Sequence, residues 1–150
     1  MHKLSWNCIA FDDLTPNQLY DILQLRTEVF VVEQKCLYQD MDDQDRHAVH
    51  VLGILDDQLL CYSRLLVPGS QYPEPAMGRV ITALSVRRQG YGKILLEESL
   101  SYCQNLWPDI GVRISAQQHL ESFYQAFDFI KVSKPYLEDG IPHIEMLRSK

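Results

Sequence analysis

The sequence contains 150 residues, 46% of them hydrophobic, which suits a single domain over residues 1–150 with its own buried core. Fourteen Lys and Arg against twenty Asp and Glu give a formal net charge of -6, and no basic stripe with interleaved aromatic residues occurs. We therefore expect no nucleic acid partner, whereas an acidic surface favours the approach of a cationic molecule such as an amine. Because the apolar runs are too short for a membrane span and the N-terminus lacks the layout of a signal peptide, we expect a cytoplasmic protein without a membrane partner.

The cysteines and histidines give no indication of a metal site. The four cysteines lie far apart in the sequence: Cys8, Cys36, Cys61 and Cys103. None has the close partner that zinc binding or thiol exchange needs, so we expect reduced, mostly buried thiols. We expect His47 and His50 on one strand at odd spacing, where they face opposite sides and serve structural roles. The sequence thus predicts no metal.

The N-terminal third predicts a strand, a long helix and an acidic loop. Residues 4–8 alternate apolar and polar side chains, which is the period of a half-buried strand. Thr15, Pro16 and Gln18 match a helix N-cap, a proline at the first helical position and the Gln of a capping box, so a helix is expected over 16–33. The acidic segment, residues 38–45, loses this periodicity. Its aspartates would attract a cationic acceptor, but we interpret the segment as a solvated loop or a short irregular helix outside the core.

The middle of the chain predicts a hairpin followed by a strand and a helix. Two β-prone runs, 47–55 and 59–67, are separated by a short polar turn and should pair antiparallel. A surface loop follows, and then a strand over 78–82, a glycine-rich turn and a helix over 90–106. Trp107-Pro108 is expected to end that helix.

The last third predicts further strands around one short helix. Residues 112–116 read as a strand, and apolar residues then recur at helical spacing: Leu120, Phe123, Tyr124 and Phe127. Two final strands are expected over 129–132 and 143–147, joined by a loop. No internal repeat interrupts this order.

The glycine-rich turn is the first candidate binding element. Arg87-Arg88-Gln89-Gly90-Tyr91-Gly92 follows a strand and opens a helix, so its amides should point at a ligand on the helix N-terminus. A diphosphate fits, because glycines allow close approach, the helix dipole favours negative charge, and Lys93 adds to the arginine charge. Lys93 is followed by Ile94 rather than Ser or Thr, and a third glycine is missing, so ATP and NAD motifs are disfavoured. The alternative is a capped turn with solvated arginines.

These elements and motifs resemble the GNAT superfamily of N-acetyltransferases over nearly the whole chain. Arg87, Gly90 and Gly92 match its Gln/Arg-x-x-Gly-x-Gly/Ala loop, and residues 123–129 are similar to its late Phe-Tyr-x-x-x-Gly-Phe motif. Asp128 stands where that motif has glycine, and Asp tolerates the left-handed conformation better than most residues. Residues 25–34 and 138–146 resemble the ElaA-type branch.

The resemblance implies an α+β fold, an α/β/α sandwich whose mixed, mostly antiparallel sheet is flanked by helices and splays at its middle. The pantetheine of acetyl-CoA would lie between the fourth and fifth strands, held by main-chain groups, with the diphosphate on the glycine turn. The cofactor-binding residues so implied are Val80, Thr82, Arg87, Arg88, Gln89, Gly90, Tyr91, Gly92, Lys93 and Gln117.

The resemblance also implies an acetyl-CoA-dependent N-acetyltransferase in which an amine attacks the thioester directly in a ternary complex. Tyr124 corresponds to the family tyrosine beside the CoA sulfur and is the candidate general acid, although such a residue could also be a buried aromatic. The fourth strand carries no carboxylate, so a water relay is expected. Glu33 and His143 lie in segments that frame the acceptor in this family, and each could be the base, orient the acceptor or be structural.

Two alternatives remain open. The chain could be a non-catalytic acyl-CoA-binding or sensing module, since no strand-four carboxylate is present to act as base. The acceptor could be a small-molecule amine or a protein amine, because loops choose acceptors in such folds. The sequence also leaves open whether the protein forms a homodimer.

Overall fold

One mixed sheet organises the chain in the computed structural model, which describes residues 3–150. Its strands run in the order β1-β2-β3-β4-β5-β8-β6, and β7 also pairs with β8. Among the described strands, β4 and β5 form the parallel pair and the other neighbours are antiparallel. The strands are β1 Ser5–Ala10, β2 Ala48–Leu55, β3 Gln58–Leu66, β4 Ala76–Thr82, β5 Val112–Gln117, β6 Ile130–Lys131, β7 Tyr136–Glu138 and β8 Ile141–Arg148.

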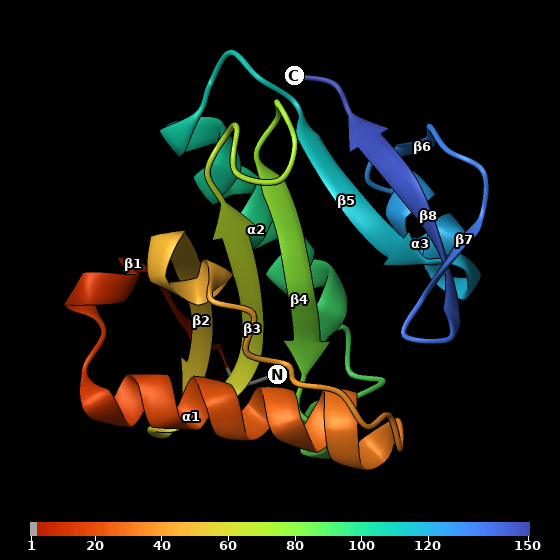
Figure 1. The fold of residues 1–150 in the computed structure, drawn as a ribbon. Coiled ribbons are helices and arrows are strands. Elements are labelled where there is room, and N and C mark those ends of the chain that lie inside the picture. Colours follow the sequence, from red (N-terminus) through yellow and green to blue (C-terminus); the bar gives the residue numbers. More distant parts are fainter. Residues whose placement is uncertain (1–2) are drawn as a thin grey trace.

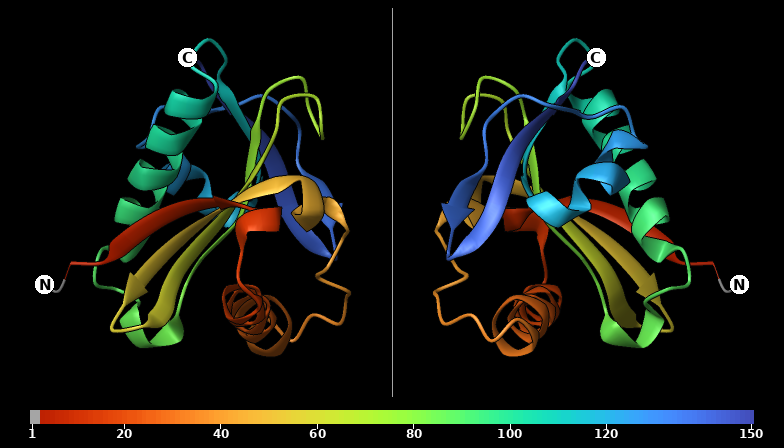
Figure 2. Two further views of the ribbon diagram at one scale, coloured as in Figure 1. Left: turned by 90° about the vertical axis from the view of Figure 1, so that its left-hand side faces the viewer. Right: turned by 90° about the vertical axis from the view of Figure 1, so that its right-hand side faces the viewer.

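Helices cover both faces of this sheet. The three α-helices are α1 Pro16–Arg26, α2 Tyr91–Leu106 and α3 Glu121–Gln125, and α1 continues as a π-helical segment, η2, over Thr27–Glu33. Short 3-10 turns are η1 Phe11–Asp13, η3 Gln44–His47, η4 Leu84–Val86 and η5 Gln118–Leu120. Figure 2 shows α1 on one face and α2 with α3 on the other, which confirms the α/β/α sandwich. No helix within residues 3–150 is both long and apolar enough to cross a membrane.

Local sequence signals produced the predicted elements. The side chain of Thr15 accepts a hydrogen bond from the Gln18 amide at 3.1 Å, and the side chain of Gln18 accepts one from the Thr15 amide at 2.9 Å, which completes the capping box. The β2–β3 hairpin is confirmed, and its turn residues Asp56 and Asp57 have φ of 50° and 62°. This left-handed pair suits the right-handed twist of a hairpin.

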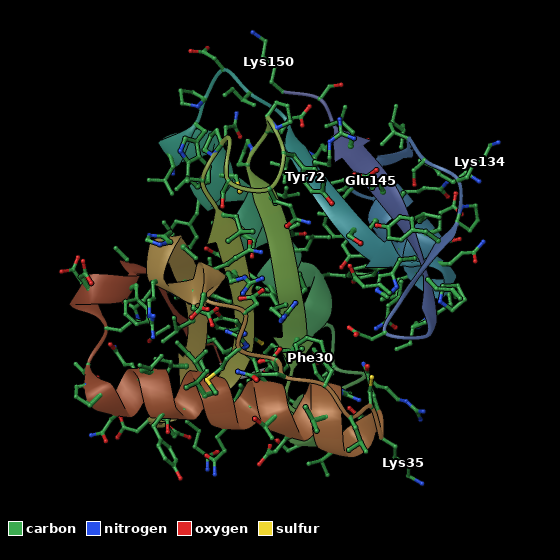
Figure 3. The ribbon with its side chains drawn as sticks, in the orientation of Figure 1. Phe30, Lys35, Tyr72, Lys134, Glu145 and Lys150 are labelled. Carbon is green, nitrogen blue, oxygen red and sulfur yellow. The ribbon has the colours of Figure 1, made fainter. Side chains whose placement is uncertain are left out.

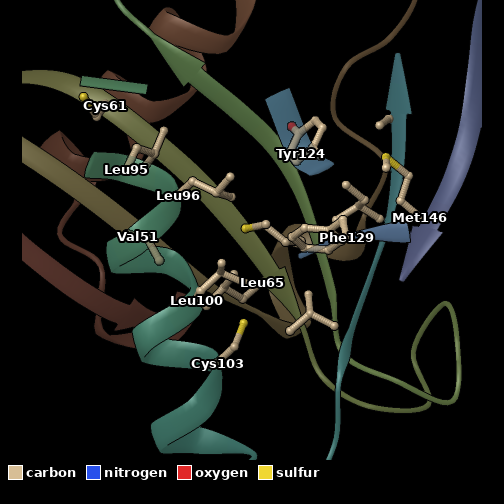
Figure 4. Close-up of a cluster of buried hydrophobic side chains, with 14 of the residues drawn as sticks. Val51, Cys61, Leu65, Leu95, Leu96, Leu100, Cys103, Tyr124, Phe129 and Met146 are labelled. Atoms are coloured by element: carbon tan, nitrogen blue, oxygen red, sulfur yellow. The ribbon is translucent and has the colours of Figure 1, made fainter. Parts of the chain in front are cut away.

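The core lies on both sides of the sheet. On the α2 side, Leu95, Leu96 and Leu100 pack against β2 and β3 and continue toward Phe129 and Met146 in the C-terminal half (Figure 4). On the other side, α1 and η2 contribute a smaller cluster: Ile22, Leu25 and Val29. The two clusters fix both helices on the sheet, because each buries an apolar stripe there.

The sheet splits between β4 and β5, as predicted. The two strands pair at Ala76 and Arg113 and then diverge, so the sheet opens as a V (Figure 1). At the narrow end, Arg113 pairs with Glu74 at 3.0 Å, and Tyr72 lies beside Glu145 in front of β5 (Figure 3). These side chains fill the narrow end of the V, so a ligand can enter only at the wide end.

A β-bulge on β4 lies at this opening. Tyr62 pairs with Ile81 and Arg64 with Gly78, so two residues of β4, Arg79 and Val80, face one residue of β3. Arg79 has a φ of 50°, in the left-handed region. A bulge leaves its extra residue out of the ladder, so Arg79 and Val80 have no regular ladder partners on β3.

The expectation that the acidic segment lies outside the core is wrong. Asp40 and Asp45 are 8% and 7% exposed. They form the arginine–aspartate cluster, whose members are Arg26, Arg64, Arg79, Asp40, Asp42 and Asp45. Buried charge is tolerated only where it is paired, and here three arginines from separate elements surround three aspartates.

Two smaller expectations also need correction. His47 belongs to η3 and precedes β2, so it does not share a strand with His50. His50 is fully buried, and its ring contacts the Tyr62 hydroxyl at 2.6 Å and the Asp45 carbonyl at 3.0 Å, which is a structural role. Cys61 and Cys103 are buried as expected, and burial raises the pKa of each thiol to about 12, whereas Cys8 and Cys36 are only half-buried.

Candidate active site

Two adjoining cavities occupy the open end of the V. The loop-side cavity, about 390 Å³, borders the acidic segment and the β7–β8 turn. The turn-side cavity, about 650 Å³, borders Thr82 and Arg87. They share six lining residues: Phe30, Gln34, Val80, Gln117, Leu120 and Ile141. Two ligands that enter from opposite sides can therefore meet at the bulge of β4.

The glycine turn presents an open helix N-terminus beside the turn-side cavity. Gly90 is the N-cap residue of α2 with a φ of 87°, and Arg88 has a φ of 63°. No side chain caps the first turn of α2, and the first amides of a helix lack intrahelical partners. Arg88, Gln89 and Lys93 are exposed around this turn. Together they provide the donors and positive charge that a diphosphate needs.

Two predicted turn residues have side chains engaged elsewhere. Tyr91 is 4% exposed and packs in the core, so only its main chain lies at the turn. Arg87 forms a two-point ion pair with Glu33, with Nη2 to Oε1 at 2.7 Å and Nη1 to Oε2. Its Nε also lies 3.4 Å from the Thr82 carbonyl. Arg87 thus joins the end of η2 to the end of β4.

The same ion pair weakens Glu33 as a base. The hydrogen bonds from Arg87 lower the pKa of the Glu33 carboxyl below its ordinary value, against a small opposing effect of burial. A carboxylate with a lowered pKa holds a proton poorly at neutral pH. Glu33 also borders the turn-side cavity, whereas Tyr124 and His143 line the loop-side cavity.

Tyr124 lies on α3 at the edge of the core and lines the loop-side cavity. Its ring contacts Phe123 and Phe129 edge-on at centroid distances of 5.2 Å and 5.8 Å, and Figure 4 shows its hydroxyl end turned toward β4. Within residues 3–150 this hydroxyl has no hydrogen-bond partner. Burial raises the pKa of Tyr124 to about 12, so the hydroxyl stays protonated and can donate. Asp128 has a φ of 69°, the left-handed conformation expected at this motif.

His143 faces the same cavity from β8. It pairs with Gln117 across the β5–β8 ladder, at the level where β5 has left β4. Its Nδ1 lies 2.7 Å from the Ile141 carbonyl, which can only accept, so Nδ1 carries a hydrogen. The other ring nitrogen, Nε2, lies 3.3 Å from Oε2 of Glu138, and the ring stacks on Tyr136. Both ring nitrogens of His143 therefore face oxygen atoms, one from the main chain and one from a carboxylate.

Glu138 was not predicted as a site residue, because the strand that carries it was missed. β7 has three residues, too few to show a period of two. The available signal was Asp139-Gly140, a dipeptide typical of tight hairpin turns, and both residues have positive φ, at 51° and 77°. The hairpin brings Glu138 next to His143.

The arginine–aspartate cluster forms the far wall of the loop-side cavity. Arg64 binds both oxygens of Asp42 at 2.8 Å and 2.9 Å and Asp45 at 3.0 Å. Arg79 binds Asp40 at 2.7 Å, and its guanidinium lies 5.8 Å from the centre of the Phe30 ring. Figure 3 shows Phe30 at the end of β4, between η2 and the opening. The cluster thereby fastens the acidic segment to the bulge.

The cluster makes stability depend on pH. Burial alone would raise the pKa of Asp45, but the hydrogen bonds and charges of Arg26 and Arg64 outweigh it and lower that pKa below its ordinary value. The pKa of Asp42 is lowered in the same way. A carboxyl with a lower pKa in the folded state stabilises fully above its unfolded pKa of ~3.9, and this stabilisation is lost as the pH falls. Urea unfolding should therefore show a steep loss of the free energy of unfolding below about pH 4. A flat profile down to pH 3 would contradict this.

Known proteins resemble this chain in both fold and sequence. The chain matches the acetyltransferase (GNAT) domain family over residues 11–150. Protein ElaA of Escherichia coli is 43% identical over 147 residues, 97% of this chain and 96% of ElaA. The crystal structure of E. coli ElaA superposes with a TM-score of 0.92, covering 97% of this chain and 99% of that one at 42% identity.

Two further solved structures show the same fold. An acyl-CoA N-acyltransferase from Pseudomonas aeruginosa has a TM-score of 0.95 and 46% identity, covering 98% of this chain and 100% of that one. An aminoglycoside 6'-N-acetyltransferase complexed with coenzyme A has a TM-score of 0.71 at 13% identity, covering 95% of this chain and 96% of that one. The predicted GNAT acyl-CoA N-acyltransferase fold is confirmed. This chain therefore belongs to the GNAT acetyltransferase family, within which it is ElaA-like.

Proposed function

We propose that this protein is an acetyl-CoA-dependent N-acetyltransferase that moves the acetyl group directly onto an amine, either of a small molecule or of a protein. The observation that carries the proposal is the pair of cavities that join at the β4 bulge. The cofactor enters from the turn side and the amine from the loop side. We also propose a cytoplasmic location, which suits four unpaired cysteines.

The cofactor assignment rests on the turn and the bulge. The open N-terminus of α2 binds the diphosphate, with Arg88 and Lys93 adding charge. The pantetheine lies along β4, where the main chain at Val80 and Thr82 borders the turn-side cavity. The guanidinium of Arg87 pairs with Glu33 and so positions η2 beside the turn, while its main chain remains part of the turn that binds the diphosphate.

The chemistry needs three proton movements. The acceptor ammonium first loses a proton to become the neutral amine. The amine nitrogen then attacks the thioester carbonyl and gives up a second proton to solvent, the carbon–sulfur bond breaks, and the departing thiolate takes a proton from Tyr124, which regains one from solvent. A thiol in water has a pKa near ~8.5, well below that of Tyr124. However, burial raises the pKa of the thiols of Cys61 and Cys103 to about 12, matching Tyr124 at about 12. A CoA thiol that is partly shielded from water has its pKa raised in the same direction, which brings it closer to that of Tyr124 and eases the transfer.

His143 serves as the base in this scheme. It lines the loop-side cavity beside Glu138, so its neutral ring can take the proton that the acceptor ammonium must lose before attack. This removes the need for a carboxylate on β4. A non-catalytic acyl-CoA-binding module, the alternative, would bind acetyl-CoA but release no thiol with any amine.

Binding of acetyl-CoA is the first test, and the glycine turn provides a sharp variant. Gly90→Val places a β-branched side chain at a φ of 87°, which distorts the turn although nothing lies within 4 Å of the added atom. The variant relieves a strain of about 1–3 kcal/mol by moving the turn amides away from the positions that bind the diphosphate. Because about 1.4 kcal/mol of binding free energy corresponds to a tenfold change in Kd, calorimetry should show a Kd for acetyl-CoA that is raised about tenfold or more.

Gly69→Val is the matched control, because Gly69 has a φ of 86° and equally open surroundings in the β3–β4 loop. It should strain the fold similarly and leave the Kd unchanged. ATP and NAD should not bind the wild-type protein. If both variants bind acetyl-CoA as the wild type does, the turn does not hold the cofactor.

A further inference from the structure

The positive side chains in the loop-side cavity are already neutralised. Arg64 and Arg79 line it, but both guanidinium groups belong to the arginine–aspartate cluster, in which three arginines meet three aspartates. The Nε atom of Arg64 has no partner, but it is buried and out of reach of a ligand. Among the described residues of this wall, therefore, no spare arginine or lysine is available for an anionic group of the acceptor.

The opposite wall carries negative charge that, among the described residues, no arginine or lysine pairs with. Glu138 and Asp139 lie at the β7–β8 turn and border the same cavity. The side chain of Glu138 is 51% exposed, and its one ion-pair contact among residues 3–150 is Nε2 of His143 at 3.3 Å. The carboxylate of Asp139 is exposed, and only its carbonyl is engaged, by the Cys36 thiol at 3.8 Å. A cation that enters the cavity meets Glu138 beside the base.

The position of Glu138 and His143 suits a direct attack of the amine on the thioester. His143 is the ladder partner of Gln117, which borders both cavities, so Glu138 and His143 lie near the point where the two ligands meet. An ammonium group held by Glu138 can pass its proton to Nε2 of His143, and the imidazolium that forms stays next to the Glu138 carboxylate.

We infer that Glu138 is the counter-ion for the acceptor's ammonium group, and that the acceptor is an alkylamine that enters as a cation and carries no anionic group close to the amine. This inference rests on the proposed function and names the substrate class of the same site. An anionic group in the cavity would face Glu138 and Asp139 with no free cation opposite, and like charges brought together cost several kcal/mol.

Three amines of equal length test the substrate class: 1,4-diaminobutane, butylamine and 4-aminobutanoate. Thiol release from acetyl-CoA by the full-length protein should give a kcat/KM for butylamine at least about tenfold above that for 4-aminobutanoate. The diamine should be used at least as well as butylamine. If 4-aminobutanoate is used as well as butylamine, the inference is overturned and the proposed function stands. If acetyl-CoA binds but none of the three releases thiol, the inference is overturned, and the proposed function then stands only if a protein amine is acetylated.

Glu138→Gln tests the residue, since it keeps the shape and removes the charge. We expect the KM for butylamine to rise about tenfold, a smaller change in kcat, an unchanged Kd for acetyl-CoA, and a smaller preference for butylamine over 4-aminobutanoate. Glu97→Gln, at an exposed position on α2, is the control and should change none of these. An unchanged KM and preference in Glu138→Gln would overturn the assignment.

Discussion

Replacing Tyr124 with phenylalanine is expected to lower kcat for acetyl transfer by about a hundredfold or more, because a positioned acid contributes ~10²–10⁴ to such a step. The change removes one oxygen that has no hydrogen-bond partner among residues 3–150 and leaves the ring contacts with Phe123 and Phe129 in place. The free energy of unfolding should therefore change by less than about 0.5 kcal/mol. Thiol release measures kcat, and calorimetry should give an unchanged Kd for acetyl-CoA.

Tyr102→Phe is the matched control, since Tyr102 lies on α2 outside both cavities. It should keep full activity. A Tyr124→Phe variant with the kcat of the wild type would show that the proton of the thiol comes from elsewhere, and Tyr124 would then be only a buried aromatic residue.

Removal of Arg26 is expected to have the largest effect on stability. Its side chain is fully buried, with Nε 2.7 Å from Asp40 and Nη1 2.7 Å from Asp45. Arg26→Met keeps much of the volume but leaves two buried carboxylates with one cation fewer. Loss of one partner from such a group costs about 3–5 kcal/mol, so urea unfolding should show a decrease of that size in the free energy of unfolding.

A surface pair in the same region is the control. Arg46 lies 3.6 Å from Asp43, and both side chains are exposed, at 66% and 90%. Because exposed ion pairs contribute about 0–1 kcal/mol, Arg46→Met should change stability by less than 1 kcal/mol. Equal effects of the two substitutions would contradict the role given to burial. Arg26→Met should also raise the KM for the amine, since the cluster holds the wall of the loop-side cavity.

Elements with local signals were predictable from the sequence. The capping box at Thr15, the hairpin at Asp56-Asp57 and the helix after Gly90 each depend on residues within four positions of one another. The left-handed Asp128 follows from its motif position in the same way. Such signals lie within a short window of sequence, so they can be recognised without knowledge of the tertiary structure.

The features that were missed depend on contacts far apart in the chain. Arg26 meets Asp45 across 19 positions, and Arg79 meets Asp40 across 39. A run of aspartates reads as a solvated loop unless the arginines that bury it are known. Glu33 meets Arg87 across 54 positions, so its lowered pKa could not be expected either. Periodicity predicted the sheet, but it does not show which charges the sheet brings together.

The most direct test of the account is turnover by the wild-type protein with acetyl-CoA and butylamine, followed by thiol release and by mass analysis of the amine. The account predicts N-acetylbutylamine and free CoA in equal amounts, only when both substrates are present, with no acetyl group left on the protein. Binding of acetyl-CoA without acetylated amine, or a stable acetyl-protein in its place, would contradict direct transfer through the joined cavities.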